Sequence, residues 1–159
     1  RYICTTKSWF GGGMDVTPSR VDKTEKKEFH KILRNMCNRH NKNYYKKYKK
    51  WCDEYFYLPH RKEPRGIGGI FFDYKKNNFE KDFKFVRDVG ITFQLIFQKI
   101  IREKIKKRWT FIDKDLQNIK RGRYTEFNLL YDRGTKFGLQ TGGNVEGILM
   151  SLPPTAKWK

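Results

Sequence analysis

Residues 51–73 of this chain have the sequence WCDEYFYLPHRKEPRGIGGIFFD, in which aromatic, charged and glycine residues are crowded together. No single helical or strand period runs through the whole stretch. Its last part, Gly66 to Asp73, predicts a buried strand because glycines introduce a run of aliphatic and aromatic side chains. A fold requires only a suitable pattern and volume of apolar side chains. The variety of polar residues before this strand therefore indicates a functional site.

The segments around this stretch predict helices. Residues 21–39, 43–57 and 79–107 carry apolar side chains at helical spacing, and residues 145–151 predict a shorter helix. Gly90 is expected to break or kink the longest of them. The apolar face of the first helix consists of Phe29, Ile32, Leu33 and Met36.

Three further strands are predicted from β-branched and aromatic residues. The first covers residues 2–9 and is expected to end at Gly11–Gly13, where glycine permits positive φ or a close backbone approach. The other two cover residues 123–131 and 135–140, joined by a hairpin turn across Asp132–Gly134. Strands that meet through hairpins, mixed with helices, predict an α+β fold rather than a doubly wound one.

The composition is that of one folded domain spanning residues 1–159. The length allows a substantial core, and the 16% aromatic content argues against disorder. No run of about 20 apolar residues is present, so no membrane span is expected. Cys4, Cys37 and Cys52 lack the spacing of a metal finger and predict reduced thiols, which indicates a cytoplasmic protein.

Basic residues outnumber acidic ones, 36 against 17, and give a net charge of +19. This excess attracts polyanions such as nucleic acid, anionic lipid or a polycarboxylate substrate, or it only keeps the protein soluble. The lysines and aromatics of residues 39–51 resemble a surface that binds single-stranded nucleic acid. As a helix, the same segment places Tyr44, Tyr48 and Trp51 on one core-facing stripe. The helical interpretation is favoured, so no nucleic-acid partner is expected.

Three blocks of the chain resemble one known family, the oxygen-dependent coproporphyrinogen III oxidases of haem biosynthesis. The blocks are residues 51–73, WFGGGMDVTP at residues 9–18 and RGRYTEFNLLYDRGTKFG at residues 121–138. The resemblance implies a flat antiparallel β-sheet flanked by helices on both faces, and a homodimer. It also implies the oxidative decarboxylation of coproporphyrinogen III to protoporphyrinogen IX. Dioxygen would be the co-substrate, and no metal or organic cofactor would be required.

The resemblance covers the C-terminal, larger part of the family's domain, in its bacterial type. Upstream of Arg1 the family has an N-terminal part, and beyond Pro153 and Pro154 it continues into a dimer-forming tail. We therefore expect a chain that lacks both parts and is inactive when expressed alone. Arg1 fits the last residue of the family's His-x-Asn-x-Arg motif, and the resemblance implies that it binds substrate.

Asp15 follows three glycines and precedes Thr17 and Pro18. By itself this pattern favours a turn residue that caps a helix starting near Pro18. In the resembled family this Asp holds the substrate through its pyrrole N–H groups, several of which can converge on one carboxylate. The resemblance thus implies that Asp15 is the catalytic residue, which would also stabilise positive charge on a pyrrole that is being oxidised.

Arg61 and Arg65 precede the glycine-rich strand of the first block. A guanidinium group binds a carboxylate through two parallel hydrogen bonds, and coproporphyrinogen carries four propionates. The resemblance favours both arginines as substrate-binding residues. The alternative is that they pair with nearby acids such as Glu54, Glu63 or Asp73.

Gly142, Gly143 and Asn144 match a substrate-binding turn of the family, in which many members have Arg at the third position. The two glycine N–H groups can bind one carboxylate oxygen in such a turn. A plain hairpin turn is the alternative for these three residues.

His30 and His60 match histidines that have been suggested as divalent-metal ligands in bacterial relatives. Two histidines 30 residues apart, without an attached carboxylate pattern, are weak evidence for a metal site. A structural role is favoured for both, with a divalent metal as the alternative.

Overall fold

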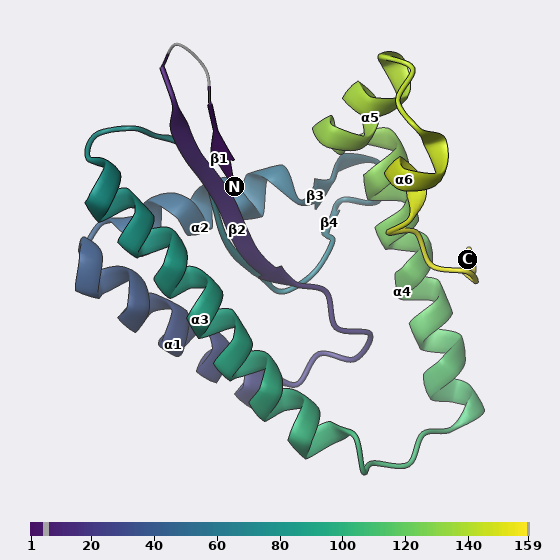
Figure 1. Ribbon diagram of the computed structural model, residues 1–159. Helices are drawn as coiled ribbons and strands as arrows, with labels where there is room; N and C mark the ends of the chain where they lie inside the picture. Colours follow the sequence, from purple (N-terminus) through teal and green to yellow (C-terminus); the bar gives the residue numbers. More distant parts are fainter. Residues whose placement is uncertain (5–6, 159) are drawn as a thin grey trace.

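The computed structural model describes residues 1–4 and 7–158 (Figure 1). Its main sheet is flat and antiparallel, with the strand order β1 (Tyr2–Ile3), β2 (Trp9–Val16) and β5 (Gly68–Lys75). A second, two-stranded sheet pairs β3 (Tyr57–Leu58) with β4 (Glu63–Pro64), on either side of the 3-10 helix η1 (Pro59–Arg61). The α-helices are α1 (Lys23–His40), α2 (Tyr44–Tyr55), α3 (Phe79–Lys104), α4 (Phe111–Leu130), α5 (Arg133–Gln140) and α6 (Val145–Leu149).

The two faces of the main sheet differ in composition. Met14 pairs with Ile70 across β2 and β5, and both side chains are buried together with that of Phe72. Successive residues of a strand point to opposite faces, so Asp15 and Phe71 lie on the other face. The first face forms the core with α1, α2 and α3, whose buried members include Phe29, Leu33, Met36, Cys37, Tyr45, Tyr48, Phe85, Val89 and Ile96.

Helix α1 begins where the sequence supplies a cap. The side chain of Asp22 accepts hydrogen bonds from the N–H groups of Thr24 and Glu25, which the first turn leaves unpaired. The helices predicted at residues 21–39 and 43–57 are confirmed as α1 and α2. The core-facing stripe predicted in α2 was only partly right: Tyr48 is buried and Tyr44 packs against the core, whereas Trp51 packs on Phe71, on the opposite face of the sheet, with ring centroids 5.5 Å apart.

Helix α3 confirms the helix predicted at residues 79–107, but the break expected at Gly90 was wrong. The helix continues through Gly90, where an added Cβ would meet no atom within 4 Å. Phe85, Val89 and Ile96 recur at helical spacing and are buried, so packing on the sheet stabilises the helix on both sides of the glycine.

The strand predicted at residues 2–9 was only partly right. Tyr2 and Ile3 form β1, whereas Thr5 and Thr6 lie outside the described residues. The glycines that were expected to end a strand instead lie inside β2. They allow β5 to approach closely, because a Cβ at Gly13 would meet the Ile70 carbonyl oxygen at 2.9 Å.

The two strands predicted at residues 123–131 and 135–140 were wrong, because both segments are helical. A capping box between Thr110 and Asp113 starts α4. Tyr124 and Phe127 are three residues apart and so lie on one helical face, whose buried side chain is Phe127. The expected hairpin turn is an N-cap instead, since Asp132 accepts the Thr135 N–H at 2.7 Å and starts α5. Asp132 was recognised as a chain-reversing residue but assigned to the wrong element.

Helix α4 stands on the other side of the sheet from α1 and α3 (Figure 1). Aromatic side chains connect α4 to that face of the sheet. Phe71 stacks on Tyr55 with ring centroids 4.8 Å apart, and Tyr55 packs on Phe127 of α4 with centroids 5.7 Å apart. The C-terminal segment returns to α4, where the Lys157 N–H donates to the Asn118 carbonyl oxygen at 2.9 Å. The α+β class, with a flat antiparallel sheet and helices around it, is confirmed. In the described part of the chain, no helix is both long and apolar enough to cross a membrane.

Candidate active site

Asp15 lies on the face of the main sheet that is opposite the apolar core. Alternation along β2 places Gly13 on this face with Asp15, the proximity of Gly11 to the Asp73 side chain places Gly11 there too, and Gly69 of β5 is the pairing partner of Asp15. Only glycine fits at position 69, because an added Cβ would meet the Met14 carbonyl oxygen at 1.9 Å. The result is a glycine-rich part of the sheet with the Asp15 carboxylate at one end, on a face that also carries the side chains of Phe71 and Asp73. We call this surface, formed by Gly11, Gly13, Asp15 and Gly69, the glycine face.

Arg65 is the direct partner of Asp15. Its Nη2 donates a hydrogen bond to Asp15 Oδ2, and its side chain is only 8% exposed. The guanidinium carbon lies 4.0 Å from the ring centroid of Phe56, 4.9 Å from that of Phe127 and 5.4 Å from that of Tyr124. These rings stabilise the charge by cation–π interaction and keep its orientation fixed. Arg65 therefore pairs with Asp15, and not with the acids Glu54, Glu63 or Asp73.

Two opposing effects set the charge of Asp15. Burial raises the pKa of the Asp15 carboxyl, while the charge of Arg65 and its hydrogen bond lower it. Arg65 Nε is buried and has no hydrogen-bond partner within the described residues. The pair thus offers a half-buried carboxylate next to a cation with one uncommitted donor. The alternative role for Asp15, a cap for a helix near Pro18, was wrong, because α1 is capped by Asp22.

Arg1 lies at the other end of the glycine face. Its Nη2 donates to both oxygens of Asp73, at 2.8 and 2.9 Å, and its guanidinium lies 5.6 Å from the ring centroid of Trp9. An added Cβ at Gly11 would meet Asp73 Oδ1 at 2.0 Å, so Asp73 lies on the same face. The structure therefore brings Arg1, Asp15 and Arg65 to one face of the sheet, although 64 positions separate the two arginines in sequence.

Arg61 and His60 converge on a buried carboxylate that the sequence analysis did not single out. Glu126 of α4 accepts two hydrogen bonds from Arg61, at 3.0 and 2.6 Å, and one from His60 Nε2 at 2.8 Å. Arg123 Nη1 lies 3.5 Å from the same carboxylate, and Arg123 also pairs with Glu63 at 2.9 Å. The hydrogen bond from Arg61, more than any other contact, lowers the pKa of Glu126 to about 2. The i,i+3 spacing of Arg123 and Glu126 would have signalled this cluster if the segment had been predicted as a helix.

The two histidines considered as metal ligands have both ring nitrogens engaged. His30 Nε2 donates to the Ile67 carbonyl oxygen at 2.9 Å and Nδ1 accepts from Tyr45 Oη at 3.0 Å. His60 bonds Glu126 through Nε2 and Tyr131 Oη through Nδ1, the latter at 2.8 Å. No group of three or more His, Cys, Asp or Glu side chains within the described residues could hold a metal ion. The metal site stays a prediction, and binding there would require each ring to give up a hydrogen bond.

Gly142, Gly143 and Asn144 form the turn between α5 and α6. Gly142 has φ of 71°, which favours glycine, and the N–H of Gly143 donates to the Gly138 carbonyl oxygen at 2.9 Å. Asn144 caps α6 by accepting the Gly147 N–H at 3.1 Å. These backbone and side-chain groups are engaged in local structure, so their role in substrate binding stays a prediction.

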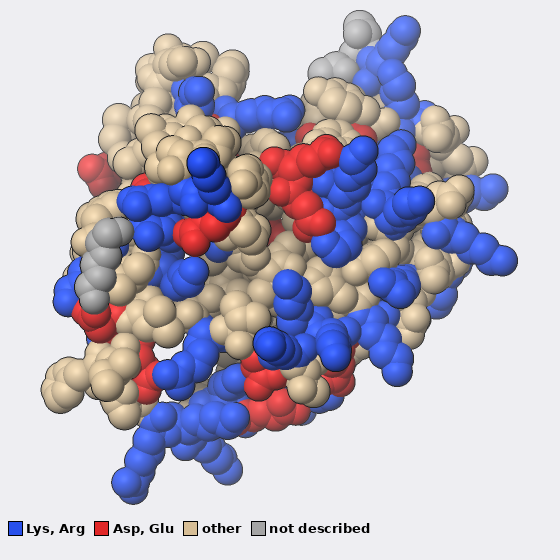
Figure 2. Space-filling view, turned by 180° about the vertical axis from the view of Figure 1, so that it is seen from behind, with Lys and Arg blue, Asp and Glu red and all other residues tan. Residues whose placement is uncertain are grey.

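Positive charge surrounds these elements. Figure 2 shows Lys and Arg side chains spread across one face of the molecule, with Asp and Glu in smaller groups and other residues between them. A protein with this charge distribution raises the local concentration of anionic molecules near its surface. Cys37 and Cys52 are buried, and burial raises the pKa of each thiol to about 12, so neither offers a thiolate near pH 7.

Comparison with known proteins identifies the family. The family model described as coproporphyrinogen III oxidase matches residues 1–159. Proteins named oxygen-dependent coproporphyrinogen-III oxidase from Rickettsia rickettsii (strain Sheila Smith), Rickettsia africae (strain ESF-5) and Rickettsia bellii (strain OSU 85-389) are 59%, 58% and 57% identical over 159 residues. Each match covers 99% of this chain and 57% of the relative's length. The chain belongs to the coproporphyrinogen III oxidase family.

Proposed function

We propose that the protein containing this chain carries out the oxygen-dependent oxidative decarboxylation of coproporphyrinogen III. In each of two steps, one propionate side chain would lose carbon dioxide and a hydride equivalent, and so become a vinyl group. Dioxygen would accept the two electrons and, with two protons, form hydrogen peroxide. The proposal is supported by the family match over residues 1–159 and by the names of the relatives.

The observation that carries the proposal is the position of Asp15 on the glycine face. A flat macrocycle can approach the backbone beside Asp15, because its pairing partner Gly69 projects no side chain there. Asp15 Oδ2 accepts one hydrogen bond from Arg65, and an ionised carboxylate has further lone pairs for pyrrole N–H donors. The same negative charge would stabilise a pyrrole ring as it becomes electron-deficient.

The two arginines on this face would have different roles toward a substrate with four propionates, and Arg1 would supply an accessible cation. Arg1 lies at the opposite end of the glycine face from Asp15, and its side chain is 55% exposed. Arg65 is buried and oriented by rings, so its main role would be to position Asp15 and hold its charge. Arg61 is committed to Glu126 by two hydrogen bonds, which favours a supporting role under the site over direct contact with substrate.

The same proposal covers cofactors, assembly and location. Dioxygen would be the co-substrate, and the electron-rich pyrroles would supply the electrons for its reduction, so no further cofactor is invoked. We also place the protein in the cytoplasm as a homodimer. Exposed apolar side chains on α3 support an interface, since such patches mark contact surfaces, and they include Phe83, Ile91, Leu95 and Phe97.

The activity is tested in a chimera in which residues 1–159 replace the matching 57% of the Rickettsia rickettsii relative. The chimera is incubated with coproporphyrinogen III in air, and the vinyl product and hydrogen peroxide are quantified. The proposal expects both products in a fixed ratio and neither of them under argon. A folded chimera that forms no vinyl product in air would contradict the proposal.

A further inference from the structure

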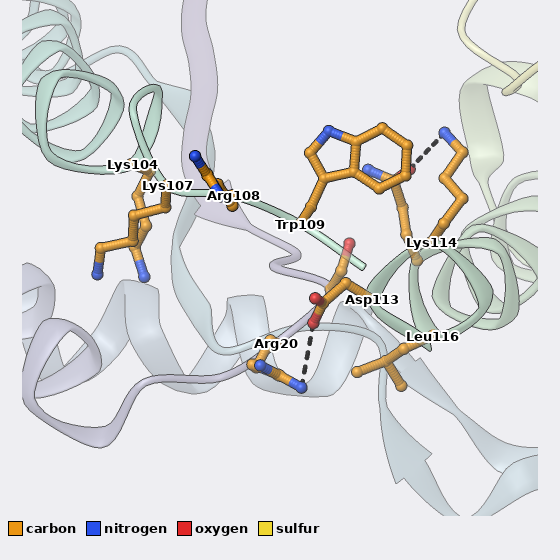
Figure 3. A pocket seen from close by; sticks show the side chains of 10 residues that line it. Arg20, Lys104, Lys107, Arg108, Trp109, Asp113, Lys114 and Leu116 are labelled. Atoms are coloured by element: carbon orange, nitrogen blue, oxygen red, sulfur yellow. Dashed lines mark hydrogen bonds and ion pairs between the residues drawn. The ribbon is translucent and has the colours of Figure 1, made fainter. Parts of the chain in front are cut away.

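A cationic pocket lies where α3 ends and α4 begins. It has a volume of about 490 Å³ and is lined by the loop after β2, the α3–α4 connection and the first turns of α4. In the view of Figure 3, Lys104, Lys107 and Arg108 lie on one side of the Trp109 indole and Lys114 on the other. None of the residues that form the glycine face lines this pocket.

The carboxylate that lines the pocket is already neutralised by its neighbours. Asp113 Oδ2 accepts from the backbone N–H of Thr110 at 2.9 Å and from its hydroxyl at 2.8 Å. Asp113 Oδ1 pairs with Arg20 at 3.1 Å, an interaction drawn in Figure 3. The charge of Asp113 is therefore balanced by the capping box of α4 and by Arg20. The electrostatic potential inside the pocket is set by the other Lys and Arg side chains that line it.

Three of those cations form no ion pair with a carboxylate of the described residues. Lys104 pairs with Glu25 at 2.8 Å. In the described part of the chain, by contrast, Lys107, Arg108 and Lys114 have no carboxylate oxygen within 4.0 Å, and Lys114 donates only to the neutral Gln117 at 2.9 Å. Cations gathered around one cavity without an acid in direct contact repel one another, and a bound anion relieves that repulsion.

Trp109 adds a flat apolar surface to this ring of cations. Its side chain is 68% exposed, although tryptophan is among the side chains that gain most from burial. An indole face can stack on an aromatic ring, while cations next to it bind the anionic groups that the ring carries. The volume falls within the range of pockets that hold small organic ligands.

We propose that this pocket is a second binding site, separate from the glycine face, for a small aromatic polyanion. The aromatic part stacks on Trp109, and its carboxylates or phosphates bind Lys107, Arg108 and Lys114. Two kinds of molecule share this chemistry, a tetrapyrrole with carboxylate side chains and a nucleotide. The inference rests on the pocket alone and does not depend on the proposed oxidase activity.

The test measures binding to residues 1–159 by equilibrium dialysis at near-physiological ionic strength, with two probes. One probe is coproporphyrin III, a stable tetracarboxylate, and the other is ATP in the absence of divalent metal. Trp109→Ala is expected to weaken the binding of at least one probe about tenfold, the size of one stacking contact. Trp109→Phe keeps a flat ring and should remain within about threefold of the parent chain. Because Trp109 is exposed, neither change should disturb the fold.

Charge is tested with a matched pair of double variants. Lys107→Gln with Arg108→Gln should weaken binding about tenfold. Lys81→Gln with Lys84→Gln removes the same charge from exposed positions on α3 that do not line the pocket, and should change it less than about twofold.

The outcome also identifies the ligand. An effect of Trp109→Ala on coproporphyrin III alone assigns a tetrapyrrole site, an effect on ATP alone a nucleotide site, and an effect on both a site for the shared chemistry. Three results would overturn the proposal. These are dissociation constants weaker than about 1 mM for both probes, no effect of Trp109→Ala on either, or equal losses in the two double variants.

Discussion

The two sides of the main sheet are held to their helices by different forces. Toward α1 and α3, the contacts are made by apolar side chains such as Leu33, Phe72 and Phe85, which are 0–1% exposed. Ion pairs also lie on that side, among them Lys75 with Asp82, at 2.9 Å, and His40 with Asp88, at 2.8 Å. Toward α4, Phe127 is as deeply buried, and a cluster of charged side chains also converges on the carboxylate of Glu126.

This difference predicts which helix contacts should weaken when the pH changes. Apolar packing does not involve a titrating group, so the contribution of these apolar contacts should change little with pH. The contacts of α4 depend on a carboxylate whose folded pKa is about 2, and so they weaken when that carboxylate is protonated. The pair of Asp15 and Arg65 lies at the boundary between the two sides, because Arg65 contacts Phe56 and Phe127.

The largest effect is expected from Phe72→Ala, on the apolar side. Phe72 packs on Phe85 at 5.0 Å and on Tyr48 at 5.5 Å, and it is 1% exposed. The free energy of unfolding should fall by about 3–5 kcal/mol. The loss should be the same at pH 4 and pH 7 in urea titrations. A loss that differed between the two pH values would show that the contribution of Phe72 is not that of apolar packing alone.

A smaller effect is expected from Glu126→Gln, on the charged side. The amide keeps the shape but loses the charge that Arg61, His60 and Arg123 contact, and the free energy of unfolding should fall by about 1–2 kcal/mol at pH 7. The folded pKa of Glu126 lies below its usual value of 4.5, so its contribution is complete above pH 4.5 and is lost as the pH falls toward about 2. The parent chain and the variant should therefore converge in stability on acidification.

Glu63→Gln provides the matched control with the smallest effect. Glu63 also pairs with Arg123, at 2.9 Å, but its side chain is 36% exposed. The free energy of unfolding should change by less than about 1 kcal/mol, as for other exposed ion pairs. If Glu63→Gln cost as much as Glu126→Gln, the special role assigned to the buried carboxylate would be refuted.

Arg65→Met sharpens the comparison at the boundary. Burial raises the pKa of Asp15 and Arg65 lowers it, so removal of the guanidinium should raise that pKa further. If catalysis requires ionised Asp15, the acidic limb of the kcat/KM profile of the chimera should move to higher pH. A lower kcat/KM with an unchanged limb would mean that Arg65 contacts substrate without tuning Asp15.

The sequence predicted the apolar side well and the charged side poorly. The helical spacing of Phe29, Leu33 and Met36 indicated α1 correctly, because a buried helical face requires that period. The segment around Glu126 is rich in aromatic and β-branched residues, so local propensity favoured a strand. Tertiary contacts of Phe127 and Glu126 outweigh that propensity and stabilise a helix.

The candidate site was predictable only in part. Asp15, Arg1 and Arg65 were named from the sequence, and the structure places them on one face. Asp15 and Arg65 are 50 positions apart in the sequence. Patterns of neighbouring residues cannot predict a contact between residues so far apart. Gly11–Gly13 were interpreted as a strand end because local rules cannot show that β5 packs against them.

The central claim is that the carboxylate of Asp15, and not merely an acidic residue on this sheet face, acts on the substrate. Asp73 is the matched control, because it lies on the same face and also pairs with an arginine. The direct measurement is kcat/KM for coproporphyrinogen III in the chimera carrying Asp15→Asn or Asp73→Asn. We expect a loss of more than about 100-fold for Asp15→Asn and of less than about fivefold for Asp73→Asn. Equal losses in the two variants, or near-parental turnover with Asp15→Asn, would contradict the account.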